Sequence, residues 1–215
     1  MKDLVSRLWN NPSNREPSRG GSDIAAAEFV VLDSETTGLD PDVDRILSVG
    51  ALRLADRRIR VRDSLEIFVA QEHFDRRSAP IHGILRQGPN PRVPEKEALE
   101  QLVTYIGDAI IVGHHIHFDL LMIRRALWRH GLAELNNPVL DTSALYRRTL
   151  LNTPVLQKKE SYTLDELARK FDLSCRDRHT ALGDAYITAM AFLKILTRLE
   201  EKRELTLKKL LRIGR

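Results

Sequence analysis

An apolar run that ends in two carboxylates constrains this chain more than any other stretch of its sequence. Phe29–Leu32 reads FVVL, a short apolar run of the kind that forms a buried strand. Asp33 and Glu35 follow at once, and alternate residues of an extended chain point to the same side. We therefore expect a central strand whose end presents two carboxylates together.

Two carboxylates this close repel each other and resist removal from water. A hard divalent cation bound through oxygen would offset both effects. Thr36, Thr37 and Gly38 then turn the chain and add hydroxyl and backbone N–H groups. The alternative is an ordinary strand end with a solvated acidic turn, and this stretch alone does not decide between the two.

The composition indicates one globular domain with a basic balance. The chain has 215 residues, 42% of them hydrophobic, a formal net charge of +4 and a sequence pI of about 9.3. Acids that hold metal inside a basic protein would suit nucleic-acid hydrolysis. No apolar run is long enough to span a bilayer, and the first ten residues lack the apolar core of a signal peptide. With Cys175 as the single cysteine, we expect a cytoplasmic protein without a membrane segment.

Three regions can be separated along the chain. Residues 1–27 are an N-terminal extension, rich in polar residues, Pro, Gly and Ser. We expect this extension to be disordered or loosely packed, and docking to a partner is the alternative. Residues 28–199 form the expected domain. Residues 200–215 are a charged amphipathic tail with interspersed leucines, either a further packing helix or a protein-binding segment.

Within 28–199, three strands come first, and helices then alternate with short strands. Expected strands cover Phe29–Leu32, Asp44–Leu54, Arg60–Val69, Ala109–Val112 and Pro138–Leu140. Expected helices begin near Pro94, follow Asp119, and cover 143–150, 161–171 and 178–199, with Trp128 in the core. Short connections make the first three strands largely antiparallel neighbours, and the whole pattern predicts a mixed α/β sheet flanked by helices.

Two further acids and a histidine lie where open α/β sheets place their functional sites. Asp119 follows the short strand at 109–112, Asp184 lies near the start of the last long helix, and His179 precedes it by five residues. Taken singly, each has a structural explanation. Asp119 could cap a helix, and His179 could be a polar loop residue.

Taken together, four motifs resemble the DnaQ-like 3′–5′ exonucleases of the DEDDh group, the family of the bacterial DNA polymerase III epsilon subunit. They are DSETTGL at 33–39, HGI at 82–84, GHxxxFD at 113–119 and HxALGDA at 179–185. The motifs occur in the family's order and span roughly 28–199. The resemblance implies a ribonuclease H-like fold, in which a mixed central sheet is flanked by helices.

The resemblance also implies a site with two Mg²⁺ or Mn²⁺ ions. Asp33 would bridge both ions, Glu35 and Asp184 would hold the ion that binds the attacking water, and Asp119 would help to hold the second ion. His179 resembles the general base. Two such ions stabilise the attacking and leaving oxygens of an in-line displacement, and the implied product is a nucleoside 5′-monophosphate released from a 3′ end.

Substrate contacts are implied for five further residues: Thr36, Leu39, His82, Gly83 and Ile84. His114 is grouped with them as a residue that orients the site. The sequence departs from the family at Ser34, where threonine is usual, and at His115 and Ile116, where Asn-Ala is common. We expect the Ser34 side chain to point away from the acids, whereas His115 could alter contacts to substrate.

Three functions are open on the sequence alone. The first is a proofreading or repair exonuclease on single-stranded DNA 3′ ends, with a DNA polymerase as the candidate partner. The second is the same chemistry on RNA or short oligoribonucleotides; SETTGL favours DNA, but contacts to the 2′-OH would decide. The third is a non-catalytic module that holds a 3′ end or a polymerase, and the presence of all five catalytic positions argues against it.

Overall fold

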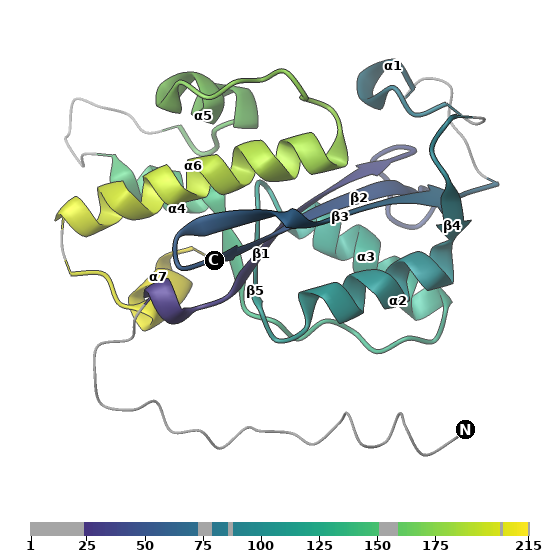
Figure 1. Ribbon diagram of the computed structural model, residues 1–215, viewed down its shortest axis with the longest axis horizontal. Coiled ribbons are helices and arrows are strands. Elements are labelled where there is room, and N and C mark those ends of the chain that lie inside the picture. Colours follow the sequence, from purple (N-terminus) through teal and green to yellow (C-terminus); the bar gives the residue numbers. More distant parts are fainter. Residues whose placement is uncertain (1–23, 73–78, 86–87, 151–158, 203, 215) are drawn as a thin grey trace.

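A six-stranded sheet runs through the computed structural model (Figure 1), which describes residues 24–72, 79–85, 88–150, 159–202 and 204–214. The strand order is β4-β3-β2-β1-β5-β6. The strands are β1 Phe29–Thr36, β2 Ile46–Ala55, β3 Arg58–Ala70, β4 Arg92–Pro94, β5 Ile110–Gly113 and β6 Val139–Asp141. β2 pairs antiparallel with both β1 and β3. β5 pairs in parallel with β1, and the edge strands β6 and β4 pair in parallel with β5 and β3, respectively. The predicted mixed sheet is therefore confirmed.

Helices cover both faces of this sheet. They are α1 Ala79–His82, α2 Glu95–Ile106, α3 His117–Arg129, α4 Thr142–Thr149, α5 Leu164–Phe171, α6 Ala181–Lys202 and α7 Leu207–Ile213. In Figure 1, α4, α5 and α6 lie on one side of the sheet and α2 and α3 on the other. None of the helices in the described part of the chain is long and apolar enough to cross a membrane.

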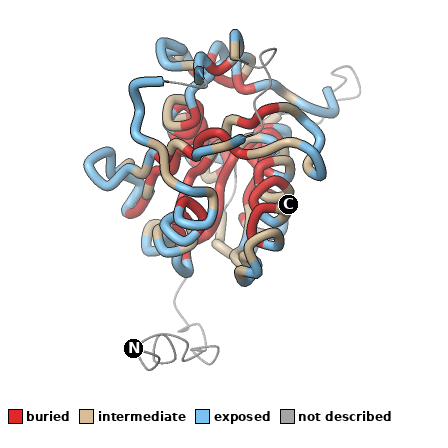
Figure 2. The backbone as a smooth tube through the Cα atoms, turned by 90° about the vertical axis from the view of Figure 1, so that its right-hand side faces the viewer, coloured by how far each residue is buried: buried red, intermediate tan, exposed pale blue. Residues whose placement is uncertain are grey.

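The alternating side chains of β1 separate two hydrophobic cores. Phe29 and Val31 belong to the core beneath α6, whereas Val30 and Leu32 belong to the core beneath α2 and α3. All four side chains are at most 1% exposed, and Figure 2 shows the buried residues concentrated in the sheet and the inner faces of the helices. Because residues two apart share a face, the odd-numbered residues of β1 point toward α6.

The structure corrects four local expectations. β1 continues through the acids to Thr36. Short elements, α1 and β4, occur in a region expected to be loop. Trp128 is 72% exposed on α3 instead of buried in the core. The last long helix begins at Ala181, three residues later than expected, because the Thr180 hydroxyl accepts a hydrogen bond from the Gly183 N–H and so caps the helix there.

Both ends of the described chain pack against the domain. Ile24 in the 3₁₀ turn η1 (Ile24–Ala26) is 4% exposed and joins the core beneath α6. Leu210 of α7 is fully buried in the same core, and the Gly214 carbonyl accepts a hydrogen bond from the Asp141 N–H. The tail was expected to be either a packing helix or a protein-binding segment, and in the structure it packs against the domain as a helix. The rest of the N-terminal extension, residues 1–23, lies outside the described residues.

Candidate active site

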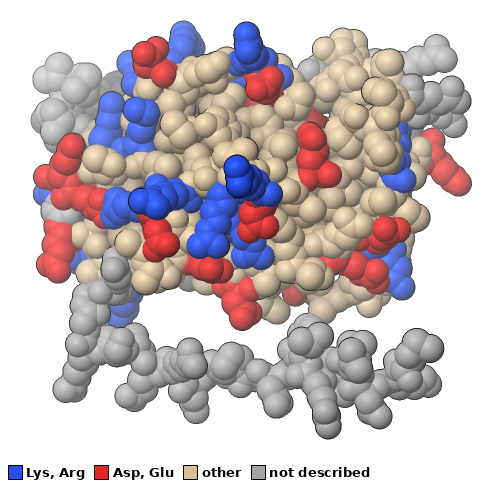
Figure 3. All heavy atoms as spheres, in the orientation of Figure 1, with Lys and Arg blue, Asp and Glu red and all other residues tan. Residues whose placement is uncertain are grey.

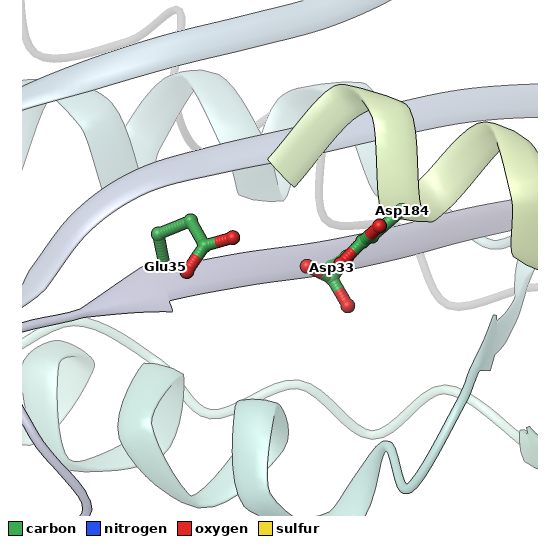
Figure 4. A group of neighbouring side chains, drawn as sticks. All are labelled: Asp33, Glu35 and Asp184. Carbon is green, nitrogen blue, oxygen red and sulfur yellow. The ribbon is translucent and has the colours of Figure 1, made fainter. Parts of the chain in front are cut away.

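The site lies on the α6 face of β1, where the alternation that buries Phe29 and Val31 continues into carboxylates. Asp33 and Glu35 follow on the same face, and Asp184 approaches them from the first turn of α6. One carboxylate oxygen from each of these three acids lies within 4.8 Å of the others. Figure 4 shows Asp33 and Asp184 side by side, with Glu35 reaching in from further along the strand.

A glycine allows α6 to come this close to the sheet. Gly50 on β2 is the register partner of Asp33. A Cβ atom at Gly50 would lie 2.2 Å from the backbone nitrogen of Leu182, a distance that no side chain tolerates. The absence of a side chain at Gly50 therefore lets the first turn of α6 rest on the sheet and carry Asp184 to Asp33.

Asp119 is the fourth predicted acid, and it is held apart from this group of three. It lies in the first turn of α3 and is 5% exposed. Its Oδ1 accepts hydrogen bonds from the Ser34 backbone N–H at 2.9 Å and from the Ser34 hydroxyl at 2.6 Å. The expectation that the Ser34 side chain points away from the acids was therefore wrong: Ser34 fixes Asp119. The sequence showed Ser34 only as a departure from the family pattern.

The electrostatics of the site disfavour ionised carboxylates in the absence of a cation. Burial raises the pKa of Asp33 well above its usual range, and the charges of Asp119, Asp184 and Glu35 raise it further, while Arg178 opposes them. Burial and the neighbouring acids raise the pKa of Glu35 to about 7. Burial likewise raises the pKa of Asp119 to about 7, against the hydrogen bonds from Ser34.

Buried and half-buried carboxylates that repel one another fit a divalent cation well. Oxygen ligands of this kind are those that Mg²⁺, Mn²⁺ and Ca²⁺ prefer. A cation would offset the burial and the repulsion that together raise the pKa of Asp33 and Glu35. The donor set of Asp33, Glu35 and Asp184, with Asp119 nearby, can therefore hold metal.

His179 and Arg178 form the turn that leads into α6. The His179 backbone N–H donates to Asp184 Oδ1 at 3.3 Å, and the residue has a left-handed φ of 65°. The residue is exposed. Arg178 donates from Nη1 to Asp184 Oδ2. Sequence reasoning missed Arg178, although it immediately precedes the HxALGDA motif.

The predicted substrate-contact residues fall into two places. His82, Gly83 and Ile84 line a cavity of about 820 Å³ together with Gly183, next to Asp184 on α6. His82 is buried, and its Nδ1 accepts a hydrogen bond from the Ile84 N–H at 3.0 Å. The HGI motif is thus close to the start of α6.

The turn after β1 carries the other two predicted contacts. The Thr36 hydroxyl donates to the Gly38 carbonyl at 2.7 Å, and this bond holds the turn. Leu39 is 82% exposed. A large apolar side chain in this position can contact a ligand, although neither Thr36 nor Leu39 lines the 820 Å³ cavity.

His114 contacts the neighbouring helix and not the acids. Its Nδ1 lies 2.8 Å from the Thr142 hydroxyl at the start of α4, and its ring stacks on His115 with centroids 4.4 Å apart. Burial, followed by the charge of His115, lowers the pKa of His114 to about 4. His115 has a φ of 55°, and its Nε2 lies 2.8 Å from the Ser161 hydroxyl. A neutral His114 can therefore hold the segment before Asp119 in place.

Comparison with known proteins decides the family. The RNase_T family model, described as Exonuclease, matches residues 30–192. The chain belongs to the DnaQ-like exonuclease family. This confirms the resemblance that the four motifs indicated, and it makes the chain a member of an exonuclease family.

Two sequence relatives of this DnaQ-like chain carry DNA polymerase III in their names. It is 35% identical over 177 residues to a DNA polymerase III PolC-type of Thermotoga petrophila, covering 81% of this chain and 12% of that protein. It is 33% identical over 181 residues to a DNA polymerase III subunit epsilon-like protein of Rhodobacter capsulatus, covering 81% of this chain and 24% of that protein. The chain therefore spans a small part of the length of either relative.

Solved structures confirm the ribonuclease H-like exonuclease fold. Escherichia coli Exonuclease I in complex with a dT13 oligonucleotide superposes with a TM-score of 0.70 at 18% identity, covering 82% of this chain and 42% of that one. Exonuclease X in complex with 5′ overhanging duplex DNA gives a TM-score of 0.62 at 22% identity, covering 87% of this chain and 99% of that one.

Proposed function

We propose that this chain is a metal-dependent 3′–5′ exonuclease of the proofreading or repair type, which releases nucleoside 5′-monophosphates from DNA 3′ ends. The observation that supports this most is the convergence of Asp33, Glu35 and Asp184 within 4.8 Å in a member of the exonuclease family. A solvated acidic turn would leave these acids apart in water. Here two half-buried strand residues meet a buried helix residue that is distant in sequence.

The four acids have the role of holding two Mg²⁺ or Mn²⁺ ions. Asp33, Glu35 and Asp184 supply converging oxygens, and Asp119, fixed by Ser34, helps to hold the second ion. When bound, such ions supply Lewis-acid activation of the scissile phosphodiester and of water.

His179 is the proposed general base. It is exposed in the turn before α6, and its backbone is tied to Asp184. Its imidazole takes the proton of the attacking water as the water oxygen bonds to phosphorus and the bond from phosphorus to the 3′ oxygen breaks. The released nucleotide keeps the phosphate, and the 3′ oxygen takes a proton from solvent, so that the shortened strand ends in a new 3′ hydroxyl.

The terminal nucleotide would lie between the HGI motif and the turn after β1. His82, Gly83 and Ile84 line the cavity beside α6, and the exposed Leu39 offers an apolar surface beyond Glu35. The related structures named above contain an oligonucleotide or DNA, which supports a DNA 3′ end as substrate. The names of the sequence relatives support a DNA polymerase as partner.

The test uses single-stranded DNA and RNA of matched sequence, labelled at the 5′ end, with Mg²⁺, Mn²⁺ or EDTA. We expect a ladder that shortens from the 3′ end of DNA with either metal and no cleavage in EDTA. Faster shortening of RNA would move the assignment to an exoribonuclease. Binding without cleavage of either polymer would contradict the proposal and favour the non-catalytic module.

A further inference from the structure

Arg178 bridges an acid of the candidate site to an acid outside it. Its Nη1 donates to Asp184 Oδ2, and its Nε donates to Asp165 Oδ1 at 2.6 Å. The Arg178 side chain is 16% exposed and that of Asp184 is 9% exposed, whereas Asp165 on α5 is 54% exposed. The guanidinium thus has one buried partner and one that faces water.

This contact occupies the carboxylate that the proposed function assigns to metal. Asp184 Oδ1 accepts from the His179 N–H, and Oδ2 accepts from Arg178. A divalent ion that binds Oδ2 meets a guanidinium at the same oxygen, and two cations at that distance repel each other strongly in a partly buried site. Metal and Arg178 therefore cannot use Asp184 equally well at the same time.

The same guanidinium stabilises the metal-free site. Asp33, Glu35 and Asp184 repel one another there, and a fixed positive charge on Asp184 offsets part of this repulsion. Arginine suits this role because its planar fork can donate to two carboxylates at once, whereas a lysine ammonium acts as a point charge.

We propose that Arg178 is the resident counter-cation of Asp184 in the metal-free protein, and that it competes with the divalent ion and turns toward Asp165 when the ion binds. The inference rests on the proposed function, since it assumes that Asp184 is a metal ligand. Asp165 remains a partner for the guanidinium after the ion displaces it from Asp184. The contact between Arg178 and Asp184 makes metal binding weaker than it would be with the acids alone.

The competition predicts opposite effects at the two ends of the bridge. Arg178→Met removes the competitor, so the Kd for Mn²⁺ should fall about tenfold, the equivalent of one buried charged hydrogen bond. Asp165→Asn removes the outer partner and leaves the guanidinium to Asp184, so the Kd for Mn²⁺ should rise. The double variant should bind as tightly as Arg178→Met, because Asp165 acts only through Arg178.

Isothermal titration with Mn²⁺ alone, without nucleic acid, measures these effects on the full chain. Arg176→Met is the matched control: it removes the same charge two residues earlier, from an exposed residue in the same loop, and should change the Kd for Mn²⁺ by less than about twofold. Arg178→Lys keeps the charge but cannot bridge both carboxylates. It should bind Mn²⁺ with a Kd between those of wild type and Arg178→Met.

Thermal unfolding in EDTA supplies a second readout that does not need metal. Arg178→Met should unfold at a lower temperature than wild type, since the acids lose their counter-cation, and its gain in unfolding temperature on adding Mn²⁺ should be larger. If Arg178→Met unfolds too readily to titrate, the Kd values of Arg178→Lys and Asp165→Asn decide instead.

Asp184→Asn separates a failure of this inference from a failure of the proposed function. If wild type binds Mn²⁺ and Asp184→Asn binds it no more weakly, the metal assignment of Asp184 is wrong and the proposed function fails with it. If Asp184→Asn weakens binding but Arg178→Met leaves the Kd unchanged or raises it, the site holds metal and the competition does not exist.

Discussion

At the residue scale, Asp33 combines partial burial with neighbouring negative charge, and a bound cation would reconcile the two. It is half-buried beside three other carboxylates, and burial first and repulsion second raise its pKa. An ionised Asp33 therefore destabilises the metal-free fold. A residue retained at such a cost in stability is typical of a functional site.

Asp33→Asn should abolish exonuclease activity and stabilise the protein in EDTA. The amide has the size of the carboxylate but removes one charge from the cluster, and each 1 kcal/mol of relieved repulsion raises the unfolding temperature by roughly 2–4 °C in a domain of this size. Calorimetry in EDTA measures this shift, with Asp108→Asn at an exposed site as the control. A lower unfolding temperature for Asp33→Asn would show that the carboxylates do not repel one another in the fold.

The metal-free protein should become less stable as pH rises from about 4 to about 7. The folded-state pKa values of Glu35 and Asp119 are raised to about 7 from 4.5 and 3.8. Between these values the folded state binds more protons than the unfolded state, so the free energy of unfolding decreases with pH.

Unfolding temperatures from pH 5 to 8 test this sign. In EDTA the curve should fall across the range, and saturating Mn²⁺ should counter the fall because the cation favours ionised carboxylates. Glu35→Gln should flatten the EDTA curve. A curve that rises with pH in EDTA would mean that the acids are already paired in the metal-free protein.

His179→Ala should lower turnover by about 10²- to 10⁴-fold, the usual contribution of a general base. The Kd for Mn²⁺ should stay at the wild-type value, because the contact of His179 with Asp184 comes from its backbone N–H. Single-turnover rates and titration calorimetry separate the two effects. Loss of Mn²⁺ binding in this variant would make His179 a part of the metal site instead of the base.

The packing of α6 on β2 determines the site at the scale of elements. Gly50→Ala would put a methyl group 2.2 Å from the Leu182 nitrogen, so the first turn of α6 must move and take Asp184 with it. We expect a loss of about 1–3 kcal/mol in the free energy of unfolding together with weaker Mn²⁺ binding. Gly88→Ala, whose Cβ would meet atoms no closer than 3.6 Å, is the control. Wild-type Mn²⁺ affinity in Gly50→Ala would show that α6 does not position Asp184.

Local sequence signals predicted the elements wherever the chain carries strong ones. The capping box of Thr163 and Glu166 starts α5 within the expected range 161–171, and the apolar run at Phe29 starts β1. The misses have physical reasons. The second half of β1 was not predicted because it carries the polar residues Asp33–Thr36. The four-residue α1 and the three-residue β4 are too short for a periodic pattern. The helix sequence around Trp128 does not indicate that this side chain is exposed.

At the scale of the whole molecule, the sequence could group the candidate acids but not predict how they are held. The packing of α6 on the sheet brings Asp184 to Asp33, and the motifs and their order were enough to group these two acids. The contacts of Ser34 with Asp119 and of Arg178 with Asp184 depend on side-chain rotamers across tertiary distances. No local pattern specifies such contacts.

Binding of single-stranded DNA should weaken as salt rises, because each neutralised phosphate releases counterions. The net charge is only +4, and on the face drawn in Figure 3 the Lys and Arg side chains lie among Asp and Glu side chains. We therefore expect a shallow slope, with log K falling by about 0.7 for each contacted phosphate per decade of salt. Fluorescence anisotropy in EDTA measures it, and affinity that is independent of salt would contradict phosphate recognition.

The most direct test of the central claim is the rate of nucleotide release from a 5′-labelled single DNA strand, measured for wild type and Asp33→Asn over a titration of Mn²⁺. The account predicts stepwise 3′ shortening by wild type that requires Mn²⁺ and vanishes in EDTA, and no release by Asp33→Asn at any Mn²⁺ concentration. Equal release by both proteins, or release in EDTA, would show that these carboxylates are not the catalytic site.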